Sequence, residues 1–174
     1  NISLAGNNVF QAGTNVVEYT VTPYGSGSIG IKGYGDADPI NQIRTTAVNN
    51  LLARQYQDIF RQTYADISWK AQQSHEQFSQ AVGNINLNTT FSESYLSQGL
   101  GMVARTIASR EALGMNRQTF FLQFDGWDHH DELLNSQAAM LEVVSKALGE
   151  FQTAMEELGL ADQVSTFTVS DFAR

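Results

Sequence analysis

Two clusters in the second half of the sequence hold residue types that bind divalent metal ions. The first is Asp128-His129-His130-Asp131 and the second contains Asp171, and each follows a short strand-like run. Carboxylate and imidazole ligands together suit a cation such as zinc or manganese. Asp128 and His130 are two residues apart, so in an extended loop their side chains point the same way. The spacing therefore predicts that either residue shares a cation with Asp171.

A purely structural role is the alternative for the same residues. The acids would then cap helices. Asp131 is the clearest example, because it stands directly before the most regular helical pattern of the chain. A histidine at the start of a helix is not favoured by the helix dipole. On this alternative Asp128 and Asp131 only cap the helix and His130 only packs against it.

A strand–helix–strand unit would bring the two clusters together. Residues 118–124 form a nearly continuous apolar run, typical of a strand buried on both faces of a parallel sheet. Apolar residues at seven-residue intervals predict a helix over about 132–158, and a β-branched run predicts a second strand over 163–169. The crossover should be right-handed, which places both clusters at one edge of the sheet. Ligands of open α/β sheets bind at the carboxyl ends of the strands.

A long amphipathic helix is predicted near the middle of the chain. Asp38 followed by Pro39 is typical of a helix start, with the acid as cap and proline in the first turn. Apolar residues then recur at three- and four-residue steps to about Ala81, as one helix or two. The other face carries many glutamines with scattered bases and acids, which is typical of a solvated face.

Another helix is predicted from a capping box formed by Thr90 and Glu93, and it should continue to about Leu113. Gly99 and Gly101 lie inside it and each costs about 1 kcal/mol relative to alanine. They indicate either that another part of the chain approaches closely or that the helix tolerates them.

Residues 1–38 are rich in glycine and asparagine. Residues 16–22 are predicted to form a strand, and residues 25–30 then match the G-x-G-x-x-G pattern of dinucleotide-binding proteins. That pattern needs a helix directly after it, to place the pyrophosphate at the helix N-terminus. Lys32-Gly33-Tyr34-Gly35 cannot start a helix well. We therefore expect residues 24–35 to form a loop or hairpin that binds no nucleotide.

The composition narrows the functional classes. The 174 residues suggest one domain, with 18 acidic residues against 10 basic ones and a formal charge of −8. This balance argues against nucleic acid as a partner, and no apolar run reaches the length of a membrane span. The absence of cysteine excludes thiol nucleophiles and iron–sulfur clusters. Of the three histidines, His75 is expected to have only a surface or packing role.

Four segments in the second half carry a resemblance to a known family. They have the sequences LGMVARTIA, FLQFDGWDHH, LGLADQV and SDFAR, at residues 100–108, 121–130, 158–164 and 170–174. Over about residues 95–174 the chain resembles the secreted bacterial family known as domain of unknown function 1501. That family is sulfatase-like and is placed in the alkaline phosphatase superfamily. The first 90 residues resemble it only through Asn1-Ile2-Ser3-Leu4-Ala5-Gly6.

The resemblance assigns roles to individual residues. Asp128 and His130 fall on the Asp and His of the family's first motif, and Asp171 and Arg174 fall on the Glu and Arg of its second. The resemblance thus implies that Asp128, His130 and Asp171 bind a divalent metal, with zinc expected and manganese or calcium as alternatives. Arg174 and His129 would stabilise the site or bind the substrate anion.

Several positions depart from the family pattern. Asp125 and Ala173 stand where the family has glycine, and His129 stands where it has threonine. Asp171 is shorter than the usual glutamate, which reduces the reach of its carboxylate. The superfamily's nucleophile-bearing segment and its final Asp-His motif have no counterpart in these 174 residues. The chain, which starts without methionine and stops after a strand-like run, is therefore expected to be a piece of a longer protein.

The expected fold is a fragment of an α/β/α sandwich with a mostly parallel sheet and long helices. We divide the chain into a Gly/Asn-rich region at 1–38, a helical segment at 39–115 and a βαβ unit at 116–174. The resemblance implies an exported, periplasmic or extracellular, metal-dependent hydrolase of small phosphate or sulfate esters. The alternative is an exported surface-assembly or binding protein with a protein partner, which keeps the fold without catalysis.

Overall fold

A small parallel sheet lies near the centre of the molecule. The computed structural model describes residues 1–14 and 18–170, and its strands are β1 (Ile2–Ser3), β2 (Tyr19–Thr20) and β3 (Phe120–Phe121). β1 lies between the other two, with Ile2 paired to Tyr19 on one side and to Phe120 on the other. This confirms the mixed α/β class with a parallel sheet. β2 and β3 fall inside predicted strands, although positions 15–17 lie outside the described residues.

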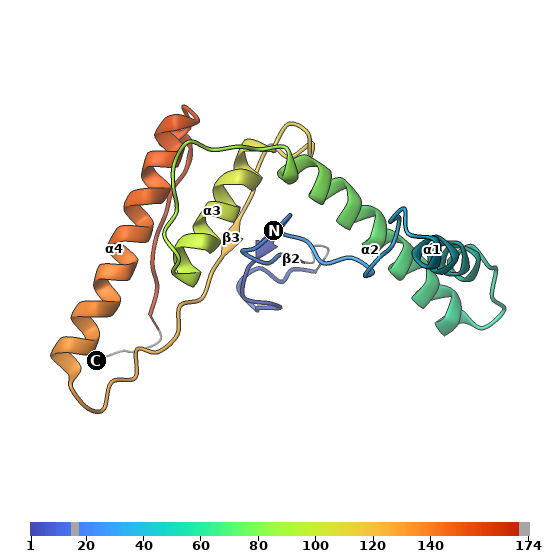
Figure 1. Ribbon diagram of the computed structural model, residues 1–174. Helices are drawn as coiled ribbons and strands as arrows, with labels where there is room; N and C mark the ends of the chain where they lie inside the picture. Colours follow the sequence, from blue (N-terminus) through green and yellow to red (C-terminus); the bar gives the residue numbers. More distant parts are fainter. Residues whose placement is uncertain (15–17, 171–174) are drawn as a thin grey trace.

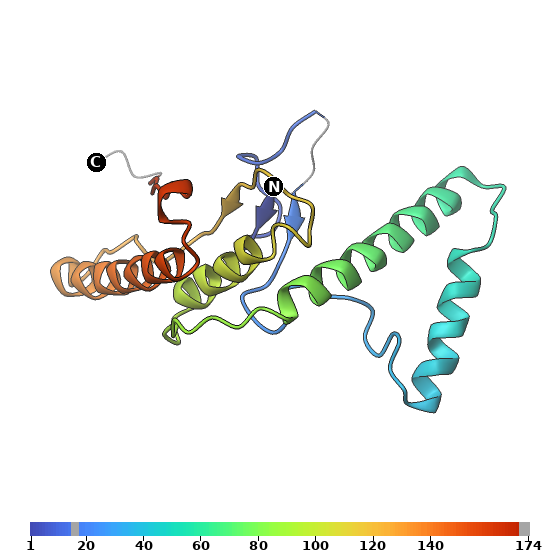
Figure 2. The same ribbon diagram turned by 90° about the horizontal axis from the view of Figure 1, so that it is seen from above.

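The predicted helix over 39–81 is two helices that project away from the sheet. They are α1 (Pro39–Leu52) and α2 (Ile59–Gly83), and they diverge from the turn that joins them (Figure 2). Asp38 caps α1 as predicted, since its carboxylate accepts hydrogen bonds from the amides of Ile40 and Asn41. Asp58 caps α2 in the same way. No helix in the described part of the chain is long and apolar enough to span a membrane.

Helix α3 (Tyr95–Ala108) occupies the middle of the molecule, between the sheet and α4 (Figure 1). The predicted capping box is wrong: Ser94 caps α3 by accepting a hydrogen bond from the Ser97 amide. The helix also ends at Ala108, short of Leu113, because the chain turns there. Both glycines of α3 do allow close approach. A methyl group at Gly99 would lie 2.9 Å from a methyl carbon of Leu122.

Helix α4 (Leu133–Glu157) is continuous, and so confirms the long helix predicted over 132–158. It packs against α3 and is followed by a short 3-10 turn, η1 (Ala161–Gln163). The predicted strand over 163–169 is wrong. Residues 164–169 pair with no strand, Phe167 is 84% exposed, and residues 166–168 line a pocket together with α4.

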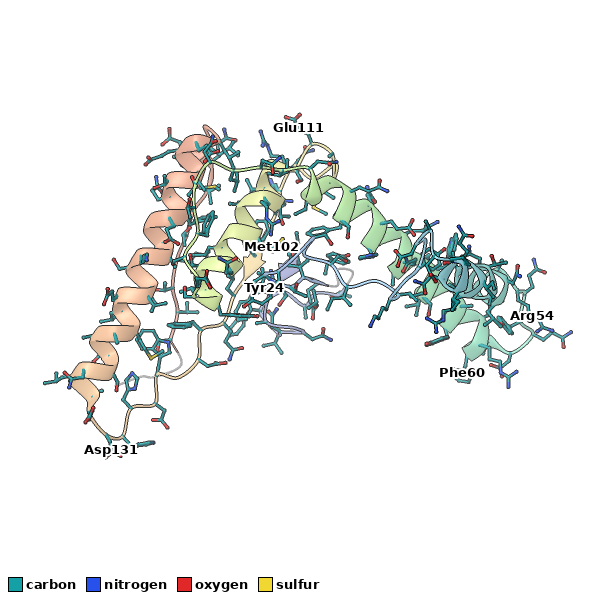
Figure 3. All side chains as sticks on the ribbon, viewed as in Figure 1. Tyr24, Arg54, Phe60, Met102, Glu111 and Asp131 are labelled. Atoms are coloured by element: carbon teal, nitrogen blue, oxygen red, sulfur yellow. The ribbon has the colours of Figure 1, made fainter. Side chains whose placement is uncertain are left out.

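One hydrophobic core joins the sheet to three helices. Almost every residue in the middle of α3 is buried, and Met102 on this helix is fully enclosed (Figure 3). The apolar side chains of β1 lie on one side of it, the end of α2 on another and the second half of α4 on a third. The buried members of this core are Ile2, Leu4, Val21, Phe78, Val82, Leu100, Met102, Val103, Ala104, Ile107, Ala147, Phe151, Ala154, Met155 and Leu160.

The glycine-rich segment forms a loop, as predicted, and it is packed along α2. Gly27 has a φ of +79°, and a methyl group there would meet Met102 and Phe78. Further on, the amide of Ile31 donates a hydrogen bond to the buried Gln72 side chain of α2. The loop therefore connects the core with the projecting helices.

Candidate functional site

The candidate metal ligands lie in the loop that joins β3 to α4, over residues 122–132. Gly126 gives the loop a turn with a φ of +98°. Trp127 then anchors it, because its indole N–H donates to the Phe124 carbonyl at 2.8 Å and its ring packs edge-on against the Phe124 ring. The His129 amide donates to the Trp127 carbonyl. These local bonds fix the path of the chain through Asp128 and His130.

Asp128 and His130 contact each other. Nε2 of His130 lies 2.9 Å from Oδ2 of Asp128, and the two side chains are 81% and 68% exposed respectively. The two-residue spacing thus places both side chains on the same side of the loop, as expected. A carboxylate oxygen and an imidazole nitrogen are available together at the surface.

His129, between these two residues, has a different environment. Its ring lies beside the Trp127 indole, with the ring centroids 6.4 Å apart. Its Nε2 atom is buried and has no hydrogen-bond partner among the described residues. An imidazole nitrogen without a partner is costly to bury, so this atom is a candidate for interaction with a further group.

The remaining candidate ligands lie outside the described residues. Asp171 and Arg174 both fall in the last four positions, which the structure does not describe. Within residues 1–14 and 18–170, no group of three or more His, Asp or Glu side chains could hold a metal ion. The structure therefore brings together two of the predicted ligands, Asp128 and His130.

The position of this pair differs from the expectation. We predicted it at the carboxyl end of β3, but the loop leaves the sheet and runs to the N-terminal end of α4, where Asp131 lies (Figures 1 and 3). Nor does Asp131 cap α4. The capping position is occupied by Glu132, which has a φ of +51°, and its side chain makes no hydrogen bond to the first amides of the helix. The left-handed residue turns the chain so sharply that the Asp131 carboxylate does not reach those amides.

A second polar cluster, which the sequence analysis missed, lies between α3 and α4. The Glu150 carboxylate accepts hydrogen bonds from the Ser92 amide, the Ser92 hydroxyl and the Ser97 hydroxyl. Burial raises the pKa of Glu150, but these hydrogen bonds and the charge of Lys146 outweigh it, so the pKa is lower than usual. No sequence signal links these residues, because they are more than 50 positions apart. The cluster fastens a loop and helix to α4.

Glu157, seven residues further along α4, also fastens the preceding loop to this helix. Its two carboxylate oxygens accept hydrogen bonds from the amides and side chains of Asn88 and Thr89. These bonds lower the pKa of Glu157. Glu150 and Glu157 thus both hold the segment between α2 and α3, and neither contacts the loop that carries Asp128 and His130. Their arrangement is structural.

Comparison with known proteins identifies a family for this chain. The family described as "Protein of unknown function (DUF1501)" matches residues 37–174, which is well over half of the chain. No curated protein and no solved structure matches the chain. The matched region includes α1 to α4, the loop with Asp128 and His130, and the C-terminal segment. The chain therefore belongs to the DUF1501 family of proteins of unknown function.

Proposed function

We propose that the protein is a metal-dependent hydrolase of the sulfatase and alkaline phosphatase type, exported from the cell and acting on small phosphate or sulfate esters. Asp128, His130 and Asp171 bind the metal, which is zinc, with manganese or calcium as alternatives. The observation that carries the proposal is the 2.9 Å contact between Nε2 of His130 and Oδ2 of Asp128 in an exposed loop. The resemblance of this segment to sulfatase-like proteins supports it.

The pair suits a shared ion chemically. Ligand atoms about 2.0–2.2 Å from a tetrahedral zinc ion lie roughly 3.4 Å apart, so a small opening of the contact would admit the ion. A neutral His130 and an ionised Asp128 would then each contribute one ligand atom. Their exposure leaves coordination positions open for water or substrate, as catalytic sites require. A metal at such a site polarises the ester oxygens of the substrate.

Two further features fit this role. The chain after η1 turns back beside α4, where Thr166, Phe167 and Thr168 line a pocket with Leu148 and its neighbours (Figure 1). This part of the chain therefore runs toward the end of α4 at which Asp128 and His130 lie. Arg174 would bind the substrate anion, and His129, whose buried Nε2 has no hydrogen-bond partner among the described residues, would stabilise the site.

Metal content tests the proposal directly. We expect elemental analysis of the purified full-length protein to find a divalent metal, and added zinc to raise the melting temperature. Asp128→Ala and His130→Ala should each abolish metal uptake, because a site this exposed depends on every ligand. His75→Ala is the control and should retain the metal, since His75 lies on α2 beside Ser79.

Two results would contradict the proposal. A wild-type protein that carries no divalent metal, and that zinc, manganese and calcium all fail to stabilise, has no metal site. A metal that is retained in Asp128→Ala has other ligands. Hydrolysis of a chromogenic aryl phosphate or aryl sulfate then separates an active metalloenzyme from a protein that binds metal without catalysis.

The second candidate function is a surface-assembly or binding role with a protein partner. The observation that favours it is the apolar surface on α1 and α2, where Ile43, Phe60 and Tyr64 are each more than 70% exposed. On this alternative the protein keeps the fold without catalysis. A full-length protein without hydrolase activity, even when loaded with metal, would support it.

A further inference from the structure

Helix α1 has its polar side turned toward the rest of the protein. Thr45 accepts a hydrogen bond from the Gly35 amide, and Asn49 accepts one from the Tyr34 hydroxyl, so this side holds the glycine-rich segment. The opposite side carries Ile40, Ile43 and Leu51, which are all exposed. No residue of α1 is buried. The helix therefore presents its apolar side to the outside, the reverse of a helix that packs on its own core.

Large apolar side chains stand at both ends of one side of helix α2, in two different environments. Phe60, Tyr64, Ile67 and Phe78 share one side of the helix by their spacing of three to four residues or multiples of it. Phe78 is buried in the core at 3% exposure, whereas Phe60 is 83% exposed at the outer end (Figure 3). Phe78 thus joins the core at the inner end of this side, whereas the apolar side chains of the first half of the helix are uncovered.

The two exposed faces together have enough apolar area for a stable interface. Seven large apolar side chains of the projecting helices are between 57% and 83% exposed. They expose roughly 1,000 Å², comparable with what each partner contributes to an interface of standard size. Surfaces of this size mark interaction sites. The residues are Ile40, Ile43, Leu51, Ile59, Phe60, Tyr64 and Ile67.

The charge distribution favours a second copy of the chain as the partner that covers these two faces. The whole chain has a net charge of −8, so two copies repel each other over most of their surfaces. Residues 39–83 carry four basic and three acidic side chains, a net charge of +1, so this repulsion is weak between the projecting helices. Asp66 and Lys70 lie beside the apolar face of α2, on the same flank and one helical turn apart. An antiparallel pairing of two α2 helices therefore sets opposite charges against each other.

We propose that the exposed faces of α1 and α2 bind the same faces of a second copy, forming a two-fold symmetric dimer. The two α2 helices run antiparallel, with the axis near Ile67. This register puts Tyr64 against the partner's Ala71 and Asp66 beside the partner's Lys70, twice by symmetry. The proposal does not depend on the proposed metal site, whose loop holds Asp131 at the opposite end of the molecule from Phe60 (Figure 3).

Sedimentation and light scattering of the wild-type and variant proteins test the interface. The wild type should be a dimer, and the double variant Phe60→Glu with Tyr64→Glu should be a monomer with unchanged helix content by circular dichroism. Leu134→Glu is the matched control, because Leu134 is 82% exposed on α4 and should leave the dimer intact. A wild type that stays monomeric at its highest soluble concentration overturns the proposal, and so does a dimer that survives the double variant.

Charge reversal tests the antiparallel register. Asp66→Lys alone and Lys70→Asp alone should each weaken the dimer at least roughly tenfold, because each sets like charges against each other across the axis. An equimolar mixture of the two variants should form a heterodimer, since every contact across the axis then joins opposite charges. Repulsion within one helix is unchanged by mixing, so recovery in the mixture reports contact between copies. A mixture that shows no recovery overturns the register.

Discussion

Glu150 shows how one side chain can connect two helices. Its carboxylate reaches from α4 to the Ser97 hydroxyl on α3 and to Ser92 just before it. Ser97 is fully buried, so its hydroxyl needs this acceptor. An ionised acceptor makes stronger hydrogen bonds than a neutral one, which explains the lowered pKa of Glu150. The contact therefore links the charge of this residue to the packing of α3 on α4.

The stability of the protein should follow this ionisation. The pKa of Glu150 is lower in the folded protein than in the unfolded chain, so its contribution is complete at neutral pH and is lost as the pH falls below about 4.3. We expect Glu150→Gln to lower the free energy of unfolding by about 1 kcal/mol at pH 7 and by less at pH 3. Urea unfolding at both pH values measures the difference.

Glu142→Gln is the control for this prediction. Glu142 lies on an exposed part of α4, and its substitution should change the free energy of unfolding by less than about 0.5 kcal/mol at either pH. A Glu150→Gln variant as stable as Glu142→Gln at pH 7 would show that the carboxylate contributes nothing to holding α3.

Contacts between residues close in the sequence could be predicted, whereas contacts between distant residues could not. The contact of Asp128 with His130 follows from a spacing of two in an extended loop. The contact of Glu150 with Ser97 depends on how two helices pack, and nothing local to either residue encodes that packing. The failure of Asp131 as a cap has a related cause, because the left-handed turn at Glu132 is set by the path of the whole loop.

At the scale of elements, periodicity predicted the helices better than the strands. α4 and the capped start of α1 follow from local patterns that tertiary contacts only reinforce. Residues 163–169 have strand-like composition, but such composition indicates only that a segment suits a pleated, half-buried surface. In the structure this segment lies beside α4, and Val169 is 73% exposed. Whether a segment pairs with the sheet depends on contacts with residues distant in the sequence. The composition of the segment itself carries no information about those contacts.

The glycine-rich loop is an element whose packing can be tested. Gly25 and Gly27 both have positive φ, but only Gly27 is enclosed, with Met102 and Phe78 within 3 Å of where a methyl group would lie. We expect Gly25→Ala to cost about 1 kcal/mol for its backbone alone. Gly27→Ala should cost roughly 1–3 kcal/mol more, because it overpacks the core at the fully buried Met102.

Thermal unfolding of the two variants measures this difference. Gly25→Ala is the matched control, because a methyl group there meets nothing within 4 Å. Equal melting temperatures for the two variants would show that the loop is not packed against α2 and α3.

At the scale of the whole molecule, burial is distributed very unevenly. Met102, Ala104 and Thr106 of α3 have no exposed surface, and the helix lies between the sheet and α4 (Figure 1). α1, at the other extreme, buries no residue and is attached through its polar side to the glycine-rich segment. The protein thus combines a core that includes the sheet, α3 and α4 with two helices that are attached to it through the end of α2 and through the glycine-rich loop.

Hydrogen exchange should reveal this division. Amides of α3 can exchange only when the core opens, whereas α1 can open alone because few apolar contacts hold it. In the monomeric Phe60→Glu, Tyr64→Glu variant we expect α1 to exchange at least roughly 100-fold faster than α3, measured by mass spectrometry of peptides from each helix. The wild-type dimer should slow exchange in α1 and in the first half of α2, while α3 is unchanged. Equal protection of α1 and α3 in the monomeric variant would contradict this division. It would mean that contacts within one chain hold α1 as firmly as they hold α3.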